Sequence, residues 1–147
     1  MPLSGDYVPG VFAPGVAQVE LYERTNGAEG RVMDGRACII LRTIGNKTGA
    51  LRKTPLMRVE HEGRYAVVAS MGGSSKNPVW YHNIRAQPVV ELQDGADLRE
   101  YVAHEATGDE RVEWWDRAVE TFPPYGDYQK KTDRLIPVFI LVPVSEA

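Results

Sequence analysis

Two short turns between segments rich in β-branched and aromatic residues constrain the fold of this chain more than any other feature. The turns are Glu62-Gly63 and Asp94-Gly95. The segments that they join are expected strands at 56–61 and 65–70, and at 89–93 and 98–105. Such short turns join antiparallel neighbours, because parallel strands need a long crossover connection. The sequence therefore predicts an antiparallel sheet and argues against a Rossmann-type fold.

The remaining segments supply the helices and the other strands. Apolar patterning predicts helices at 16–24, 77–85 and 107–122, strands at 37–43 and 136–142, and one or two helical turns within 125–134. Asn77-Pro78 is a typical helix start, with Asn77 as the N-cap, and Thr107 to Glu110 matches a capping box. Trp115 falls in the apolar stripe of its helix, so we expect it in the core. About six antiparallel strands with helices at the edges predict an α+β fold whose sheet curls into a barrel.

Composition limits the classes of function. A chain of 147 residues is expected to form a single domain, 1–147, with an irregular N-terminal arm at 1–14. The net charge of −3 argues against a nucleic-acid-binding protein, so any cationic site must be local. The single cysteine, Cys38, excludes an intrachain disulfide. With no signal peptide or membrane-spanning run recognisable in the sequence, we expect a cytoplasmic protein.

A first glycine-rich loop, which begins at Gly45, carries closely spaced cations. Lys47, Arg52 and Lys53 lie within seven positions, and Lys76 follows in a second glycine-rich loop. The order of residues differs from that of a Walker A motif, because here the lysine precedes the second glycine. Glycine amides, hydroxyl groups and cations are suited to binding a phosphate, although a lysine in a hairpin loop can also be merely solvated.

The second loop leads directly to aromatic residues. Ala69-Ser70-Met71-Gly72-Gly73 is followed within a few residues by Trp80 and Tyr81. Trp80 could be an ordinary core residue, but Asn83, close by on the same expected helix, is too polar for a plain core stripe. Phosphate-binding loops beside flat aromatic rings suggest a phosphate-bearing aromatic cofactor.

The segment after Pro123-Pro124 holds the candidate substrate-binding residues. Tyr125 and Tyr128, preceded by Phe122, either cap the barrel or line the mouth of a pocket. Ser70, at the end of a strand, could donate a hydrogen bond to a ligand. His61, His82 and His104 lack the spacing of metal ligands, so no metal site is expected, and no elbow motif supports hydrolase chemistry.

Four segments together resemble a known family. They are Gly45-Asn-Lys-Thr-Gly-Ala-Leu-Arg-Lys-Thr-Pro-Leu56, Ala69-Ser-Met-Gly-Gly73, Asn77-Pro-Val-Trp-Tyr-His-Asn83 and Tyr125-Gly-Asp-Tyr-Gln-Lys-Lys-Thr-Asp-Arg-Leu-Ile-Pro-Val138. In order and spacing, from about residue 35 to 144, the chain resembles the deazaflavin-dependent nitroreductases of actinobacteria. The resemblance implies a split β-barrel, similar to that of FMN-binding flavin reductases. It also implies coenzyme F420, an 8-hydroxy-5-deazaflavin with a phospholactyl oligoglutamate tail.

The resemblance also implies which residues form the site. Catalytic roles would fall to Tyr125 and Ser70, and the acceptor would contact Phe122, Tyr125 and Tyr128. The cofactor-binding residues would be Lys47, Thr48, Arg52, Thr54, Pro55, Leu56, Ala69, Ser70, Met71, Gly72, Gly73, Lys76, Trp80 and Asn83. Of these, Lys47, Arg52 and Lys76 would hold the phosphate and the acidic tail.

The implied activity is hydride transfer from reduced coenzyme F420 to conjugated acceptors such as enones and coumarin-like or furanocoumarin-like compounds, or to quinones or nitroaromatics. Asn46 and Met71 stand where relatives often carry basic residues, and Phe122 stands where the nitroimidazole-activating member has a tyrosine. Two alternatives remain: an FMN-dependent oxidoreductase of the same fold, and a non-catalytic protein that binds a cofactor or small molecule. Whether the chain is a monomer or a homodimer stays open, as does peripheral association with a membrane.

Overall fold

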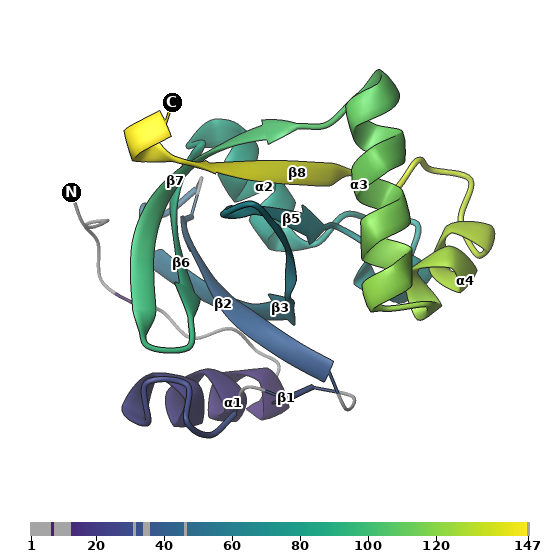
Figure 1. Cartoon of the computed structure of the whole chain (residues 1–147). Helices are drawn as coiled ribbons and strands as arrows, with labels where there is room; N and C mark the ends of the chain where they lie inside the picture. Colours follow the sequence, from purple (N-terminus) through teal and green to yellow (C-terminus); the bar gives the residue numbers. More distant parts are fainter. Residues whose placement is uncertain (1–6, 8–12, 31, 34–35, 46, 147) are drawn as a thin grey trace.

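In the described part of the chain, the fold is built on one antiparallel sheet of eight strands (Figure 1). The computed structural model describes residues 7, 13–30, 32–33, 36–45 and 47–146. The strands are β1 (Val32–Met33), β2 (Arg36–Ile44), β3 (Leu51–Met57), β4 (Val59–His61), β5 (Arg64–Val68), β6 (Val89–Asp94), β7 (Asp97–Glu105) and β8 (Val138–Pro143). The hairpin turns predicted from the sequence are present, with Glu62, Gly63 and Gly95 in the left-handed conformation.

The order of the strands makes this sheet a split barrel. Along the sheet the order is β1-β2-β6-β7-β8-β5-β4, and β3 pairs with β2. Only Arg58 separates the end of β3 from the start of β4, although these strands lie at opposite ends of the pairing order. The chain itself therefore brings the two ends of the sheet together, so that the sheet must curl. The predicted α+β class with an antiparallel split barrel is confirmed.

Within the described residues, four α-helices flank the barrel (Figure 1). They are α1 (Ala13–Arg24), α2 (Val79–Ala86), α3 (Gly108–Thr121) and α4 (Pro124–Lys130), with short 3₁₀ turns η1 (Met71–Gly73) and η2 (Val144–Glu146). One apolar core fills the barrel and includes Trp80 and Ile84 of α2. A second core lies between the sheet and the pair α3 and α4. None of the helices in the described part of the chain is both long and apolar enough to cross a membrane.

Two predicted details of the strands were wrong. The segment 56–61 is not one strand, because the chain breaks at Arg58, whose amide donates to the carbonyl of Ala37. Residues 51–55, for which no strand was predicted, belong to β3, so the loop that begins at Gly45 ends before Leu51. Most of the predicted N-terminal arm lies outside the described residues, and α1 already begins at Ala13.

Three predicted details of the helices were also wrong. Asn77 is not an N-cap, since Pro78 occupies that position without a side-chain cap and Asn77 binds Arg134 instead. The capping box is absent, because Glu110 pairs with His104 at 2.8 Å rather than with the backbone of its own helix. In α3, Trp114 is the buried tryptophan, and Trp115 is only partly buried against the same core.

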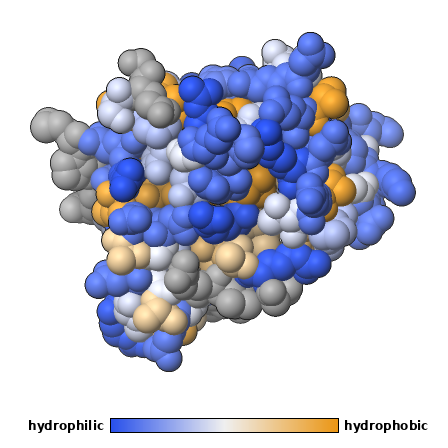
Figure 2. Space-filling view, viewed as in Figure 1, coloured by the Kyte–Doolittle hydropathy of each residue, from blue (hydrophilic) through white to orange (hydrophobic). Residues whose placement is uncertain are grey.

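Much of the surface is hydrophilic, as the composition requires. Figure 2 shows one face on which hydrophilic residues predominate and apolar residues form small, separate patches. This face carries no extended apolar surface. The regions of chemical interest are two cavities along β3 and α2, one of which is also lined by residues of α4.

Candidate functional site

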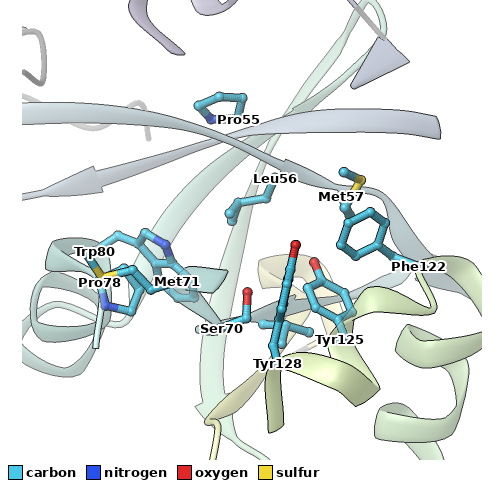
Figure 3. A pocket seen from close by; sticks show the side chains of 11 residues that line it. Pro55, Leu56, Met57, Ser70, Met71, Pro78, Trp80, Phe122, Tyr125 and Tyr128 are labelled. Carbon is cyan, nitrogen blue, oxygen red and sulfur yellow. The ribbon is translucent and has the colours of Figure 1, made fainter. Parts of the chain in front are cut away.

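One cavity, which we call the aromatic cavity, has a volume of about 260 Å³ and opens between β3, α2 and α4 (Figure 3). Its lining consists mainly of apolar and aromatic side chains, with a single serine. The lining residues are Pro55, Leu56, Met57, Val68, Ser70, Met71, Pro78, Trp80, Phe122, Tyr125 and Tyr128. Concave, mostly apolar sites with few polar groups are typical of small-molecule binding.

Each wall of the aromatic cavity comes from the end of a regular element. The end of β3 supplies Leu56, the chain just beyond β5 supplies Ser70, and the first turn of α2 supplies Trp80. Pro123-Pro124 ends α3 and starts α4, which brings Tyr125 and Tyr128 to the opposite wall. In Figure 3 the hydroxyl groups of Ser70 and both tyrosines point into the space beneath β3.

Tyr125 is the most enclosed polar side chain of the aromatic cavity. It is 5% exposed and packs edge-on against Phe122, with ring centroids 4.9 Å apart. Burial, and secondarily the neighbouring Tyr128, raise the pKa of Tyr125. Its hydroxyl has no hydrogen-bond partner among the described residues, so the neutral phenol is free to donate to a ligand.

A second cavity, which we call the cationic cavity, lies at the other end of β3 and has a volume of about 570 Å³. It is lined by Gly45, Lys47, Thr48, Arg52, Val79, His82 and Asn83. Lys47 has no ion-pair partner within the part of the chain that the structure describes. A Cβ atom on Gly45 would lie 3.1 Å from the Thr48 hydroxyl oxygen, so a side chain there would crowd the loop. This set of cations and hydroxyl and amide donors is suited to an anion.

The two cavities share β3 and α2. Arg52 and Leu56 lie on the same face of β3, four residues apart, and line the cationic and the aromatic cavity respectively. Trp80 and Asn83 lie on consecutive turns of α2; Trp80 lines the aromatic cavity and Asn83 lines the cationic cavity. Asn83 is bound to Thr43 of β2 at 3.4 Å, which attaches α2 to the barrel. One elongated molecule could therefore place an anionic part at one end and a ring at the other.

The structure brings most of the predicted site residues to these two cavities, but not all. The predicted residues that line neither are Thr54, Ala69, Gly72, Gly73 and Lys76. Lys53 belonged to the predicted cationic cluster, but its ammonium group pairs with Glu23 of α1 at 2.8 Å. Adjacent residues of a strand point to opposite faces, so Arg52 and Lys53 cannot both serve the cavity.

Several lining residues were not predicted from the sequence. They are Met57, Val68 and Pro78 in the aromatic cavity and Gly45, Val79 and His82 in the cationic one. His82 had been set aside because it lacked metal-ligand spacing, yet it lies next to Asn83 on α2. Its position next to Asn83, a predicted cofactor-binding residue, was a usable signal.

Gly73 shapes the site without lining it. Its φ is +86°, and a Cβ atom there would lie 2.8 Å from the Tyr128 carbonyl oxygen. Gly63 is the matched control, because its φ is +80° and an added Cβ would meet nothing within 4 Å. We expect Gly63→Ala to lower the free energy of unfolding by about 1–2 kcal/mol through backbone strain alone. Gly73→Ala should cost about 1–3 kcal/mol more, through the clash with α4.

Denaturant unfolding of the two variants measures this difference. Equal losses for Gly73→Ala and Gly63→Ala would mean that the loop moves away from α4 without cost. The close approach of Gly73 to Tyr128 would then not be what holds the loop beside the aromatic cavity.

Comparison with known proteins places this geometry in a family. Residues 16–143 match the family model described as F420H(2)-dependent quinone reductase. An F420H(2)-dependent quinone reductase of Mycobacterium tuberculosis is 34% identical over 125 residues, which is 82% of this chain and 84% of the relative.

Solved structures agree with this assignment. One titled as an F420-H2 dependent reductase (FDR-A) is 52% identical, with a TM-score of 0.68 over 71% of this chain and 92% of that one. Another, titled as a domain-swapped dimer, is 48% identical, with a TM-score of 0.71 over 85% of this chain and 92% of that one. The match to the family model, residues 16–143, spans the residues that line both cavities. The chain therefore belongs to the F420H(2)-dependent quinone reductase family, a family of oxidoreductases.

Proposed function

We propose that this protein binds reduced coenzyme F420 across the two cavities and reduces quinones and other electron-poor conjugated acceptors. Enones, coumarin-like or furanocoumarin-like compounds and nitroaromatics belong to the same proposal. The observation that carries it is the adjacency of a cationic and an aromatic cavity along β3 and α2. Bound there, the reduced deazaflavin would supply a hydride.

The donor set of the cationic cavity supports an acidic ligand. Lys47 and Arg52 are cations, and Thr48 and Asn83 add hydroxyl and amide donors. Charge-assisted hydrogen bonds to phosphate or carboxylate contribute about 1.5–3 kcal/mol each when partly shielded. A volume of about 570 Å³ leaves room for more than one phosphate group, which favours a tail of several negative charges over the single phosphate of FMN.

The aromatic cavity supports a ring and an acceptor beside it. Trp80 and Leu56 offer apolar contact to a flat ring, and Ser70 lies at the cavity wall between them and the tyrosines. Tyr125 would donate its phenol hydrogen to a carbonyl oxygen of the acceptor, which withdraws charge from the carbon that is reduced. Tyr128 would pack against the acceptor from the same helix.

Two residues limit the acceptors. Phe122 brings no hydroxyl to the acceptor side and is buried against Tyr125. We therefore expect nitroaromatics to be poorer acceptors than quinones or enones, because fewer donors can hold the nitro oxygens. Met71 is 55% exposed at the cavity wall, where it adds apolar contact and no charge. Neither residue removes the phenol of Tyr125 from the cavity.

A homodimer is part of this proposal, since the structure titled as a domain-swapped dimer is 48% identical to this chain. Light scattering on a size-exclusion column distinguishes it from a monomer. The cytoplasmic location and a peripheral contact with a membrane stay predictions from the sequence.

A paired titration tests the proposed function. We expect oxidised coenzyme F420 to quench the tryptophan fluorescence of the protein at concentrations at which FMN has no effect. Addition of a quinone to protein and reduced cofactor should then restore the absorbance of the oxidised deazaflavin. Tighter binding of FMN would contradict the choice of cofactor. Binding without any reoxidation, across quinone, enone and nitroaromatic acceptors, would favour the non-catalytic alternative.

A further inference from the structure

The guanidinium group of Arg134 binds the loop that leads from β5 to α2. Its Nε donates to the carbonyl of Ser74 at 2.8 Å, and its Nη1 donates to the side-chain oxygen of Asn77 at 2.8 Å. Its Nη2 donates to the carbonyls of Ala69 at 3.0 Å and Ser70 at 2.9 Å. All four acceptors are neutral, and no carboxylate pairs with Arg134 within the described part of the chain.

These contacts hold the loop at both of its ends. Ala69 and Ser70 begin the loop, Ser74 follows η1, and Asn77 immediately precedes the N-cap of α2. Arg134 is itself anchored to α4, because the side chain of Gln129 donates to its carbonyl at 2.8 Å. One side chain thus joins the wall that carries Ser70 to the helix that carries the two tyrosines of the aromatic cavity.

The cation also acts on two particular peptide groups. The carbonyls of Ala69 and Ser70 belong to the same peptide units as the amides of Ser70 and Met71. Neither amide has a hydrogen-bond acceptor among the residues that the structure describes. In a trans peptide the N–H points away from the C=O, so these amides face away from the guanidinium. A cation on the carbonyl side polarises the unit and makes its N–H a stronger donor.

We propose that Arg134 is a positioning residue that fixes the loop from Ser70 to Ser74 against α4 and strengthens the Ser70 and Met71 amides as hydrogen-bond donors to the ring of the bound cofactor. The loop position rests on the contacts above. The role toward the ring rests on the proposed function. Lysine cannot replace arginine here, because one ammonium group cannot span acceptors at both ends of the loop.

The first measurement needs no cofactor. In native-state hydrogen exchange, the amides of Gly73 and Ser74, which donate to Ser70 and Met71, should exchange about tenfold faster in Arg134→Lys than in the wild type. Arg111→Lys is the matched control, because Arg111 also donates to a backbone carbonyl, that of Ile136 at 2.7 Å, away from both cavities. Unchanged exchange at Gly73 and Ser74 in Arg134→Lys would overturn the role of Arg134 in fixing the loop.

The second measurement uses the deazaflavin. With the protein saturated by cofactor, Arg134→Lys should lower kcat by about a hundredfold, since a shift of about 1 Å in a reacting geometry costs that much. KM for the quinone should change far less, and the absorbance maximum of the bound deazaflavin should shift from its position in the wild type. Arg111→Lys should keep the wild-type kcat and spectrum. Equal behaviour of the two variants would reduce Arg134 to a purely structural residue.

A milder variant tests the proposal in case Arg134→Lys does not fold. Asn77→Ala removes one of the four acceptors and should change hydrogen exchange and kcat in the same direction, by a smaller factor. No change in either measurement would count against the proposal. Failure of the wild type to bind the deazaflavin would instead remove the proposed function and the role toward the ring. The exchange experiment would still decide whether Arg134 fixes the loop.

Discussion

Replacing Arg52 with alanine is expected to weaken the binding of coenzyme F420 by about 10- to 150-fold. The physical reason is the loss of one charge-assisted hydrogen bond to an acidic group, worth about 1.5–3 kcal/mol. Arg52 lines the cationic cavity and lies opposite Thr43 in the β2–β3 pairing. Fluorescence titration with the cofactor measures the change. The loss should shrink as salt is added, because the interaction is partly screened.

Lys53→Ala is the matched control for this prediction. Lys53 is the next residue of β3 and carries the same charge, but its ammonium group pairs with Glu23 of α1. We expect the affinity for the cofactor to stay within about twofold of the wild type, because the site is unaltered and long-range effects are screened. Equal losses in the two variants would mean that only the net charge matters. The assignment of the acidic tail to the cationic cavity would then be wrong.

Tyr125→Phe is expected to lower kcat for quinones and enones by about a hundredfold. Removal of a single hydrogen-bond donor to a developing oxyanion typically costs this much. The substitution keeps the ring against Phe122, so the packing of α4 should survive. Stopped-flow reoxidation of the reduced deazaflavin measures the rate, and the affinity for the cofactor should be unchanged.

The pKa of Tyr125 adds a second readout to the same variant. Burial raises this pKa above the ordinary tyrosine value of 10.0, so the phenol keeps its proton at and beyond that pH. Ionisation of this donor should therefore not reduce the rate below about pH 10. Tyr65→Phe is the control, since the Tyr65 phenol is also held protonated but donates to Asp94 outside both cavities. An unaltered rate in Tyr125→Phe would remove Tyr125 from the mechanism.

The antiparallel barrel was predictable because its determinants are local. Glu62-Gly63 and Asp94-Gly95 form tight turns, and the strands on either side of each turn must pair antiparallel. The two cavities were predictable in part for a related reason. Most of their residues come from the short segments 45–56, 70–83 and 122–128, whose composition already suggested an anion and a ring.

Two of the errors arose because a residue outside the helix binds the side chain that was expected at the start of that helix. Asn77 is a good N-cap by type, but the guanidinium of Arg134, 57 positions away, takes its side-chain oxygen. The sequence pattern places Glu110 in a capping box, but His104 on β7 binds its carboxylate instead. The role of Arg134 had no local signal at all, because its acceptors at 69, 70, 74 and 77 precede it by 57 to 65 positions.

The pairing of Thr43 with Arg52 and of Arg42 with Lys53 has a consequence for length variation in the hairpin at 45–50. One residue added or removed there would shift β3 by one position and exchange the faces of the two cations. Arg52 would then leave the face of β3 that lines the cationic cavity, and Lys53 would leave the face on which it pairs with Glu23. The length of the hairpin thus determines which cation of β3 faces the cationic cavity. Natural or engineered changes in this loop should be tolerated in steps of two residues, and single insertions should abolish binding with every site residue still present.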